Sequence, residues 1–479
     1  MSRRVTVAAV DLGAESGRVT TVGFDGTRLH LDVAHRFTHA PVEVDGVLRW
    51  DLPHLWAEIR SGLAILDAGS VPISSIGVDA WGVDYGLLTA AGDLLDQPTC
   101  YRDPRNVTAM ERAVGRVGAE AMYGATGVQI IPINTVFSLV ADVTEQPHRL
   151  EGADRMLMMP DVVHHLLSGS VVTEYTAAST TGLFDLRSGT WATGLLEDLG
   201  IPARLMPEVA APGTDVGGLV GGWTGALRDT RVVLPPAHDT ASAVVGAPLD
   251  ERGSLFISSG TWSLVGVETR HPIVTEESRR ENLTNEGGYA GTVRLLRNVM
   301  GLWILQNCRR QWAREGHELS YQEIADLASA EPGQVSLIDP DANVFLSPGD
   351  MPRRIQDDCA RRGVPVPRTV GAVARCVIDS LAASYRSVLD AVTDVTGSRP
   401  SSVSIVGGGS SHTLLSQLTA DATGLPVRCG PVEATALGNA AVQLVAAGEL
   451  DGLADIRRVV AASSDIVEYE PRSTPSRTN

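Results

Sequence analysis

The sequence predicts an α/β protein of two domains, and three observations lead to that prediction. The chain has 479 residues, which is too long for one ordinary domain. It is 43% hydrophobic and 20% charged, and its 49 glycines are typical of α/β proteins with many tight strand-to-helix turns. Residues 254–267 and 400–409 repeat the pattern of residues 3–13 and 73–82, which indicates either an internal duplication or a coincidence between common α/β turns.

The first half begins with strands. Residues 3–13 are rich in Val and Ala and closed by glycine, which predicts a buried strand, and residues 17–37 alternate around an Asp-Gly turn as antiparallel strands do. A helix is expected over 51–69, with Asp51 as its cap before Pro53. One strand is expected over 74–88, so the order is mixed rather than a regular alternation of strand and helix.

The second half is also predicted to contain strands, glycine turns and helices. Residues 254–267 predict two strands around a glycine turn, and 371–397 predict a long amphipathic helix that ends at Gly397. Residues 403–424 predict a strand, three glycines, a serine cap and a helix whose buried face holds Leu414, Leu415, Leu418 and Ala422. Turn residues near 245–253 place the expected domains at 1–247 and 248–463, followed by a frayed tail over 464–479.

Charge and cysteine content argue against several classes of protein. The net charge of −18 and the lack of a basic run argue against partners such as nucleic acid or an anionic membrane. The first apolar run stops at Asp11, too early for a signal peptide or a membrane span. Five scattered cysteines predict neither a disulfide framework nor a zinc site and favour a cytoplasmic location, although Cys359 and Cys376 could lie near each other.

Asp11 to Arg18, "DLGAESGR", is the first candidate for chemistry. A glycine turn between two buried strands can direct backbone N–H groups at a phosphate, Asp11 can hold Mg²⁺ through water, and Arg18 can add positive charge. The alternative is an ordinary hairpin loop with a solvated Asp and Arg. The turn is not a Walker A sequence, because no GKS or GKT follows it.

Two further glycine turns could bind phosphate. Residues 258–266, "SSGTWSLVG", place hydroxyl groups around Gly260, and residues 403–424 place three glycines before a helix, where a nucleotide could approach the backbone. If the duplication is real, the first of these turns faces Asp11 to Arg18 across a cleft. Each turn could equally be a plain connection between elements.

The stretch 235–247, "PPAHDTASAVVGA", places His238 beside Asp239 at the expected start of a helix. Asp239 can be a helix cap, or it can be a catalytic base that the helix N-terminus keeps ionised. A metal site at His238 is disfavoured, because no second ligand stands at a suitable spacing. Residues 79–86 and 101–105 mix aromatic and charged groups as sugar sites do, with Trp81 as core filler the alternative.

In this order and at these distances, the segments resemble the FGGY carbohydrate kinases of the actin-like ATPase superfamily, from residue 5 to 462. The segments are VDLGAESGRV, SIGVDAWGVDYGLL, YRDPR, MMPDVVHHLLSG, EYTAASTTGLFD, AHDTASAV, SSGTWSLVG, NLTNEGG, NVMGLWILQ, IVGGGSSHTLLSQL and GPVEATALGN. Three of them, AHDTASAV, LTNEGG and NVMGLWILQ, resemble the branch of the family that acts on L-rhamnulose. Glu15 is a departure, since that family usually has Ser or Thr at this position of the turn.

The resemblance implies two actin-like (ribonuclease H-like) domains, each a mixed five-stranded sheet flanked by helices, with a cleft between them. It also implies a site in which Asp239 is the general base. The other implied roles are sugar binding by Gly82, His238, Thr240 and Asn298, and ATP binding by Ala14, Glu15, Ser16, Gly17, Arg18, Thr261, Gln306 and Gly408. Asp11 is expected to be the carboxylate on the Mg²⁺ side, mainly from its chemistry.

The implied reaction is phosphorylation of L-rhamnulose by MgATP in a monomer or homodimer. The first alternative is a kinase of the same family that acts on another ketose or polyol, such as L-fuculose or L-xylulose. A sensor without catalysis on the same fold is a second alternative, although it would not need a base. A serine or histidine hydrolase is disfavoured, since no GxSxG elbow is present.

Overall fold

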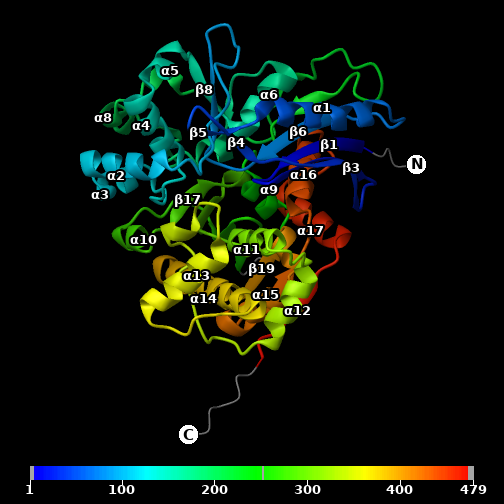
Figure 1. Ribbon diagram of the computed structural model, residues 1–479. Helices are drawn as coiled ribbons and strands as arrows, with labels where there is room; N and C mark the ends of the chain where they lie inside the picture. The colour runs from blue at the N-terminus through cyan, green and yellow to red at the C-terminus, as the bar shows by residue number, and fades with distance from the viewer. Residues whose placement is uncertain (1–4, 251–252, 473–479) are drawn as a thin grey trace. The chain divides into compact units, whose positions relative to one another are not determined.

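The protein is described by a computed structural model that covers residues 5–250 and 253–472 and divides into two compact units (Figure 1). The first unit holds the residues up to Pro248, Glu268–Leu295 and Ala434–Ser464; the second holds Leu249–Val267, Leu296–Glu433 and the residues from Asp465. Each unit thus takes residues from both halves of the chain. The expected domain limits, 1–247 and 248–463, stay predictions.

The main sheet of the first unit has six strands in the order β13-β14-β6-β1-β2-β3. The central strand β1 is antiparallel to β2, which follows it along the chain, and parallel to β6. Val7, Ala8, Ala9 and Val10 in this strand are fully buried, as the sequence predicts. The strands are β1 (Val5–Leu12), β2 (Ser16–Phe24), β3 (Leu29–Thr38), β6 (Ser75–Ala80), β13 (Asp215–Gly218) and β14 (Arg231–Val233).

Helices cover both faces of this sheet. Helix α1 (Leu52–Asp67) begins after Asp51, whose carboxylate accepts the His54 N–H and confirms the expected cap. Figure 1 shows α1 on one side of β1 and β6 and α16 (Ala434–Ala446) on the other. Val7 and Val22 from the sheet pack in one apolar core with residues of α16 and α17 (Leu453–Ser463).

Residues 74–88 form two strands rather than the single strand expected. Strand β6 ends at Ala80, and β7 (Tyr85–Leu88) pairs instead with β8 (Arg155–Met158) in a separate ladder. Val83, between them, has φ of 71°, a left-handed conformation that no extended strand can contain. The Thr135 hydroxyl holds it by donating to the Val83 carbonyl, so the break depends on a contact distant in sequence.

The remaining elements of the first unit are short strand pairs and helices. The strands are β4 (Pro41–Val44), β5 (Val47–Trp50), β9 (Thr173–Glu174), β10 (Phe184–Asp185), β11 (Thr190–Trp191) and β12 (Val209–Ala210). The helices are α2 (Arg105–Val117), α3 (Ala119–Thr126), α4 (Thr135–Glu145), α5 (Pro147–Gly152), α6 (Met159–Ser168), α7 (Tyr175–Ala178), α8 (Thr193–Leu199), α9 (Asp239–Val245) and α10 (Glu276–Arg280), with 3₁₀ turns η1 (Ala203–Leu205) and η2 (Tyr289–Gly291).

The second sheet has seven strands in the order β17-β18-β16-β15-β19-β20-β21. Strand β15 is antiparallel to β16 and parallel to β19, which repeats the pairing of β1 with β2 and β6. The repeated strand pattern is therefore confirmed in the topology, whereas six and seven strands replace the five expected in each sheet. The strands are β15 (Ser254–Ser259), β16 (Ser263–Thr269), β17 (Thr284–Gly287), β18 (Val293–Val299), β19 (Ser402–Val406), β20 (Val427–Cys429) and β21 (Val467–Tyr469).

The long helix expected in the second half is confirmed as α14 (Val370–Thr396), with Gly397 left-handed at its end. Helix α15 (Thr413–Thr423) is capped by His412, whose ring accepts the Leu415 N–H, and not by a serine. Its buried face holds Leu415, as expected, together with Ser416, Thr419, Ala420 and Thr423 in place of Leu414, Leu418 and Ala422. The other elements are α11 (Trp303–Arg314), α12 (Tyr321–Ala330), α13 (Met351–Arg362), η3 (Asn343–Phe345) and η4 (Gly408–Ser411).

Part of the expected tail is ordered structure. Strand β21 lies within residues 464–479 and pairs antiparallel with β20, because the chain returns to an open edge of the sheet. Residues 473–479 and the boundary residues 251–252 lie outside the described part of the chain. None of the helices described is long and apolar enough to cross a membrane.

Candidate active site

Two aspartates lie side by side where β1 and β6 end. Asp11 and Asp79 are register partners in these parallel strands. Asp79 is fully buried, and burial together with the charge of Asp11 raises its pKa well above the usual range. Asn439 on α16 donates to one oxygen of Asp79 at 2.6 Å, while the other oxygen, Oδ1, has no hydrogen-bond partner within the described chain.

The turn after β1 is held by two interactions. Arg18 donates through Nε to Asp11 at 2.9 Å, directly across the β1–β2 hairpin. The ring Nε2 of His39 contacts the Gly13 carbonyl at 2.8 Å, and burial lowers the pKa of His39 to about 4, so the neutral ring donates that hydrogen bond. The structure thus brings together Asp11 and the turn residues predicted to bind phosphate, namely Ala14, Glu15, Ser16, Gly17 and Arg18.

Oxygen donors in this region suit a magnesium ion. Mg²⁺ prefers carboxylate oxygens and commonly takes only one or two of them, the rest coming from water and substrate phosphates. Asp11 and the buried Asp79, with its unsatisfied oxygen, fit that requirement. Among the described residues, no three His, Cys, Asp or Glu side chains are arranged to hold a metal by themselves.

Asp239 is the first residue of α9, and His238 occupies the cap position before it, so the reading of Asp239 as the helix cap is wrong. Its carboxylate accepts the Thr240 N–H at 2.6 Å, and its side chain keeps 28% of its surface exposed. Burial raises the pKa of Asp239, against the opposing effects of His238, Thr240 and Arg294. Desolvation thus opposes the effect of the helix N-terminus that is expected to keep Asp239 ionised, and that expectation stays a prediction.

The strand-like segment before Asp239 is fixed to the sheet. Ala80 at the end of β6 donates its N–H to the Ala237 carbonyl at 2.9 Å, and Ala80 and His238 form a parallel bridge. The buried carboxylate of Glu174 accepts the Ala237 N–H at 2.9 Å and the Thr176 hydroxyl at 2.6 Å. Asp239 is therefore carried at the end of the same sheet as Asp11 and Asp79, on a rigid support.

Gly82 lies against His238. A Cβ at position 82 would stand 3.2 Å from His238 Nε2 and 3.2 Å from the Thr180 side chain, so a side chain there would crowd that ring nitrogen. His238 Nε2 also lies 3.3 Å from Asp239 Oδ1. Of the predicted sugar-binding residues, Gly82, His238, Asp239 and Thr240 are thus brought together in the first unit.

In the second unit, the turn between β15 and β16 meets the start of α11. The Trp303 N–H donates to the Thr261 carbonyl at 3.0 Å. Gln306 follows in the first turn of α11, and its buried side-chain oxygen, Oε1, has no hydrogen-bond partner among the residues described. An unsatisfied buried amide is a suitable donor and acceptor for a ligand. Asn298 lies on β18, the strand that leads toward this helix.

The three glycines after β19 differ in whether the structure leaves space for a side chain. Gly407 has φ of 82° and packs on the Ser259 carbonyl, and a Cβ at Gly409 would meet Ser259 Oγ at 2.0 Å. The fold therefore requires both. A Cβ at Gly408 would meet nothing within 4 Å, so its backbone faces open space, as a nucleotide-binding glycine must. The structure brings Gly408 close to the β15 end that leads to Thr261.

Trp81 and Arg105, from the two segments expected near a sugar, make contacts within the first unit. Trp81 is 5% exposed, packs on Trp50 and donates to the Asp84 carboxylate at 2.8 Å, so the core alternative holds for it. In the segment 101–105, the buried Arg105 pairs with Asp142 at 2.9 Å. These groups stabilise the fold of the first unit.

Comparison with known proteins decides the family. Residues 6–246 match the N-terminal domain, and residues 255–447 the C-terminal domain, of the FGGY family of carbohydrate kinases. The chain belongs to this family. This FGGY kinase is 41% identical over 470 residues to the rhamnulokinase of Pectobacterium atrosepticum, covering 98% of this chain and 93% of the relative. It is 40% identical over 468 residues to the rhamnulokinase of Bacteroides thetaiotaomicron, covering 97% and 95%.

Solved structures confirm the fold of this FGGY kinase. A gluconate kinase from Lactobacillus acidophilus superposes with a TM-score of 0.80 at 16% identity, covering 98% of this chain and 94% of the other. A xylulose kinase from the same organism superposes with a TM-score of 0.79 at 17% identity, with the same coverage. The predicted two-domain α/β kinase fold, with mixed sheets flanked by helices, is confirmed.

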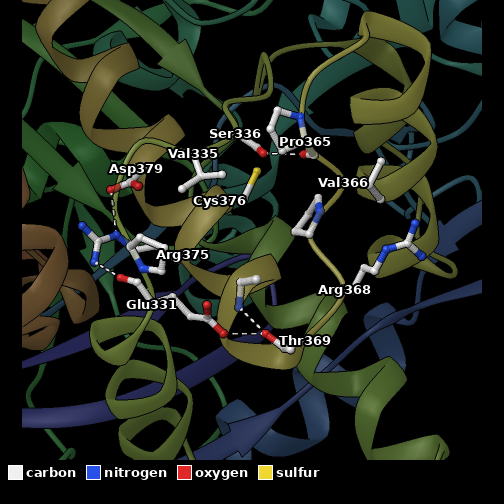
Figure 2. Close-up of a pocket in the computed structure, with 13 residues that line it drawn as sticks. Glu331, Val335, Ser336, Pro365, Val366, Arg368, Thr369, Arg375, Cys376 and Asp379 are labelled. Carbon is white, nitrogen blue, oxygen red and sulfur yellow. Dashed lines mark hydrogen bonds and ion pairs between the residues drawn. The ribbon is translucent and has the colours of Figure 1, made fainter.

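One cavity of this FGGY kinase is lined by residues other than those predicted to bind sugar or nucleotide. It encloses about 160 Å³ in the second unit, and Figure 2 shows Arg375, Cys376 and Asp379 of α14 beside Ser336 and Pro365. None of the residues predicted to bind sugar or nucleotide lines it. Arg375 is already paired with Asp379 at 2.9 Å, so the cavity presents few groups for a ligand.

Sequence reasoning missed four residues around Gly82 and the segment 237–239 in this FGGY kinase. They are Glu174, Thr180, Glu286 and Arg294. Glu174, Thr180 and Glu286 occur in segments that carry the family resemblance, but no local pattern separated them from surface polar residues. A buried charge is recognisable only from its neighbours, and these neighbours are distant in sequence.

Proposed function

We propose that this kinase phosphorylates L-rhamnulose with ATP, giving L-rhamnulose 1-phosphate and ADP, and that Asp239 is the general base. The two relatives that are about 40% identical over nearly their whole length are named rhamnulokinases, which supports this sugar. The observation that carries the mechanism is the position of Asp239, a partly exposed carboxylate 3.3 Å from His238 Nε2, the ring nitrogen against which Gly82 lies.

In the proposed reaction, the oxygen of a ketose hydroxyl attacks the γ-phosphorus of ATP. A new P–O bond forms, the bond between the γ-phosphorus and the ADP oxygen breaks, and the hydroxyl proton passes to Asp239. The raised pKa of Asp239 makes its carboxylate a stronger base than an ordinary aspartate. Gly82, His238, Thr240 and Asn298 are proposed to orient the sugar.

The proposed nucleotide residues are Ala14, Glu15, Ser16, Gly17 and Arg18 in the first unit, and Thr261, Gln306 and Gly408 in the second. Asp11 is proposed to hold Mg²⁺, which when bound neutralises negative charge on the phosphates. The exposed backbone at Gly408 and the unsatisfied amide of Gln306 support the assignment of the second set. We also propose a cytoplasmic location, which the five free cysteines support, and a monomer or homodimer.

Asp239→Asn tests the mechanism. The amide cannot accept the proton, so turnover is expected to fall at least about 10²-fold. Calorimetry is expected to show that ketose binding is largely retained. Asp229→Asn, an exposed aspartate of the same unit, is the matched control and keeps normal turnover. Turnover like that of the unaltered enzyme in Asp239→Asn would remove Asp239 from the mechanism.

A panel of ketoses tests the substrate. Rates of ADP formation with L-rhamnulose, L-fuculose, L-xylulose and D-xylulose are compared at equal concentration, and L-rhamnulose is expected to have the highest kcat/KM. If L-rhamnulose is among the poorest, the alternative ketose kinase is correct. If no ketose is phosphorylated although ketose binds, the sensor alternative is correct.

A further inference from the structure

Arg294 on β18 is a fully buried cation that contacts the proposed sugar-binding histidine. Its Nη2 lies 3.2 Å from His238 Nδ1, its Nη1 lies 3.1 Å from Glu286 Oε2, and its Nε donates to the Gly287 carbonyl at 2.9 Å. The side chain has no exposed surface. A buried arginine is retained in a fold only where its charge is paired, and Glu286 provides that pairing.

The contact with Arg294 determines which nitrogen of His238 carries the proton. A guanidinium has five N–H donors and no acceptor, so Nδ1 of His238 must present its lone pair to Nη2. In the neutral ring the proton then resides on Nε2. Glu286 Oε2 also lies 3.3 Å from Nδ1, but that contact does not have hydrogen-bond geometry, and the same oxygen faces Arg294.

The protonated nitrogen faces the proposed reaction centre. His238 Nε2 lies 3.3 Å from Asp239 Oδ1 and is the ring nitrogen against which Gly82 lies. In the opposite tautomer, Nε2 would present a lone pair to the Asp239 carboxylate 3.3 Å away, which is a repulsive contact, and it could only accept a hydrogen bond from the sugar. The tautomer therefore decides whether His238 can donate a hydrogen bond to the sugar.

We propose that Arg294, held by Glu286, is a positioning residue that fixes His238 as the Nε2–H tautomer. His238 then donates through Nε2 to the sugar oxygen, and the Nε2 proton rather than a lone pair lies toward Asp239 Oδ1 at 3.3 Å, which favours the ionised carboxylate that receives the hydroxyl proton. Arg294 acts through His238 and does not touch the substrate. This inference rests on the proposed roles of His238 and Asp239.

Nuclear magnetic resonance of the histidine ring nitrogens tests the tautomer directly. The enzyme is labelled with ¹⁵N-histidine, and among its 11 histidines the His238 signals are identified as those lost in His238→Asn. The expected pattern is a protonated Nε2 and an unprotonated Nδ1. A protonated Nδ1, or protons on both nitrogens, in the unaltered enzyme overturns the proposal.

Kinetics of Arg294 variants test the consequence. Arg294→Met is expected to lower kcat about 10- to 100-fold, by analogy with the loss of a partner that orients a metal-binding histidine, and to shift the His238 signals. Arg294→Lys keeps a cationic donor and is expected to retain more of the activity. Arg294→Met with unchanged kcat and an unchanged tautomer overturns the proposal.

Two further variants separate positioning from stability. Arg294→Met/Glu286→Met removes both charges together, so no unpaired buried charge is left, and it is expected to fold with the same loss of kcat as Arg294→Met. Arg149→Met removes a similarly buried arginine that pairs with Asp96 and Asp142, and it is expected to lower stability without changing kcat of the folded enzyme. If Arg149→Met lowers kcat as much as Arg294→Met does, a specific role for Arg294 is overturned.

The outcomes distinguish this inference from the proposed function. If Asp239→Asn is inactive while His238 has the other tautomer, the proposed function stands and the role of Arg294 is wrong. If Asp239→Asn remains active, the proposed function fails whatever the tautomer.

Discussion

Arg18 and Asp11 face each other across the first hairpin of the chain, with Arg18 Nη2 2.8 Å from Asp11 Oδ2. The two side chains are proposed to serve different parts of MgATP, one the ion and the other a phosphate. Their pairing orients both side chains at the end of β1 before the nucleotide binds. Each is therefore expected to influence how the other binds its part of the nucleotide.

Asp11→Asn removes the negative charge on the proposed Mg²⁺ side. We expect the Mg²⁺ concentration for half-maximal activity to rise about tenfold or more, since a neutral amide is a weak ligand for this ion. A titration of initial rate against Mg²⁺ at saturating ketose measures the change. Asp215→Asn breaks an exposed ion pair with Arg231 on the same sheet and is the control, with no expected effect. An unchanged Mg²⁺ requirement in Asp11→Asn would exclude the assignment.

Helix α9, which begins with Asp239, packs backbone to backbone on α16. A Cβ at Gly438 would meet the Ser242 carbonyl at 1.9 Å, so Gly438→Ala must push the two helices apart. We expect a loss of stability of about 1–3 kcal/mol, together with lower turnover, because α9 carries the proposed base. Chemical denaturation and steady-state kinetics measure both effects.

Gly115 on α2 is the matched control for Gly438. A Cβ there meets nothing within 4 Å, so Gly115→Ala is expected to stabilise the protein by about 0.5–1 kcal/mol and leave turnover unchanged. Equal effects of the two substitutions would show that the contact between α9 and α16 has no special importance.

Glu174 is expected to make stability depend on pH. Burial raises the pKa of Glu174 from 4.5 to about 7. Between these pH values the folded protein keeps a proton that the unfolded chain releases, so stability falls as pH rises through this window. Glu174→Gln removes the titration, and the slope between pH 5 and 7 is expected to be less negative by about 1.4 kcal/mol per pH unit.

Denaturant unfolding at several pH values measures this slope. Asp84, whose pKa burial raises to about 7, contributes in the same direction and remains in the variant, so a smaller negative slope persists. Glu43→Gln, at an exposed position on β4, is the control with no change in slope. A slope in Glu174→Gln that equals that of the unaltered protein would contradict the prediction.

Cys376 lines the cavity of Figure 2, and its thiol contacts that of Cys359. Both are free, and burial raises the pKa of Cys376 to about 12. The thiolate is the reactive form, so we expect Cys376 to react about 10³-fold more slowly with an aromatic disulfide at pH 7.5 than an ordinary cysteine. An introduced exposed cysteine, Ser188→Cys, is the control and reacts at the ordinary rate. Fast reaction of Cys376 in the folded protein would contradict its burial.

Local signals predicted much of the fold correctly. Asp51 before a proline marked the start of α1, Gly397 marked the end of α14, and the Asp-Gly turn marked the β2–β3 hairpin. These signals depend on backbone conformation over a few residues. Residues 74–88 misled the prediction, because the break at Val83 depends on Thr135, which is 52 positions away.

In the candidate site, too, local sequence patterns identified some residues, whereas others depend on contacts between distant parts of the chain. Gly82, His238 and Asp239 occur in recognisable segments, and the structure brings them together at the end of one sheet. Arg294 and Glu174 carried no signal of their own. Their importance comes from burial beside His238 and Ala237, which no short stretch of sequence records.

The sequence by itself determined the family, the strand and helix content and the identity of the polar turns, because these depend on residue type and short-range spacing. Only the tertiary structure decided the electrostatic state of the candidate site. Burial raises the pKa of Asp239 although it begins a helix, and Arg294 decides the tautomer we infer for His238. Such effects arise from desolvation and from partners distant along the chain, and both exist only once the protein has folded.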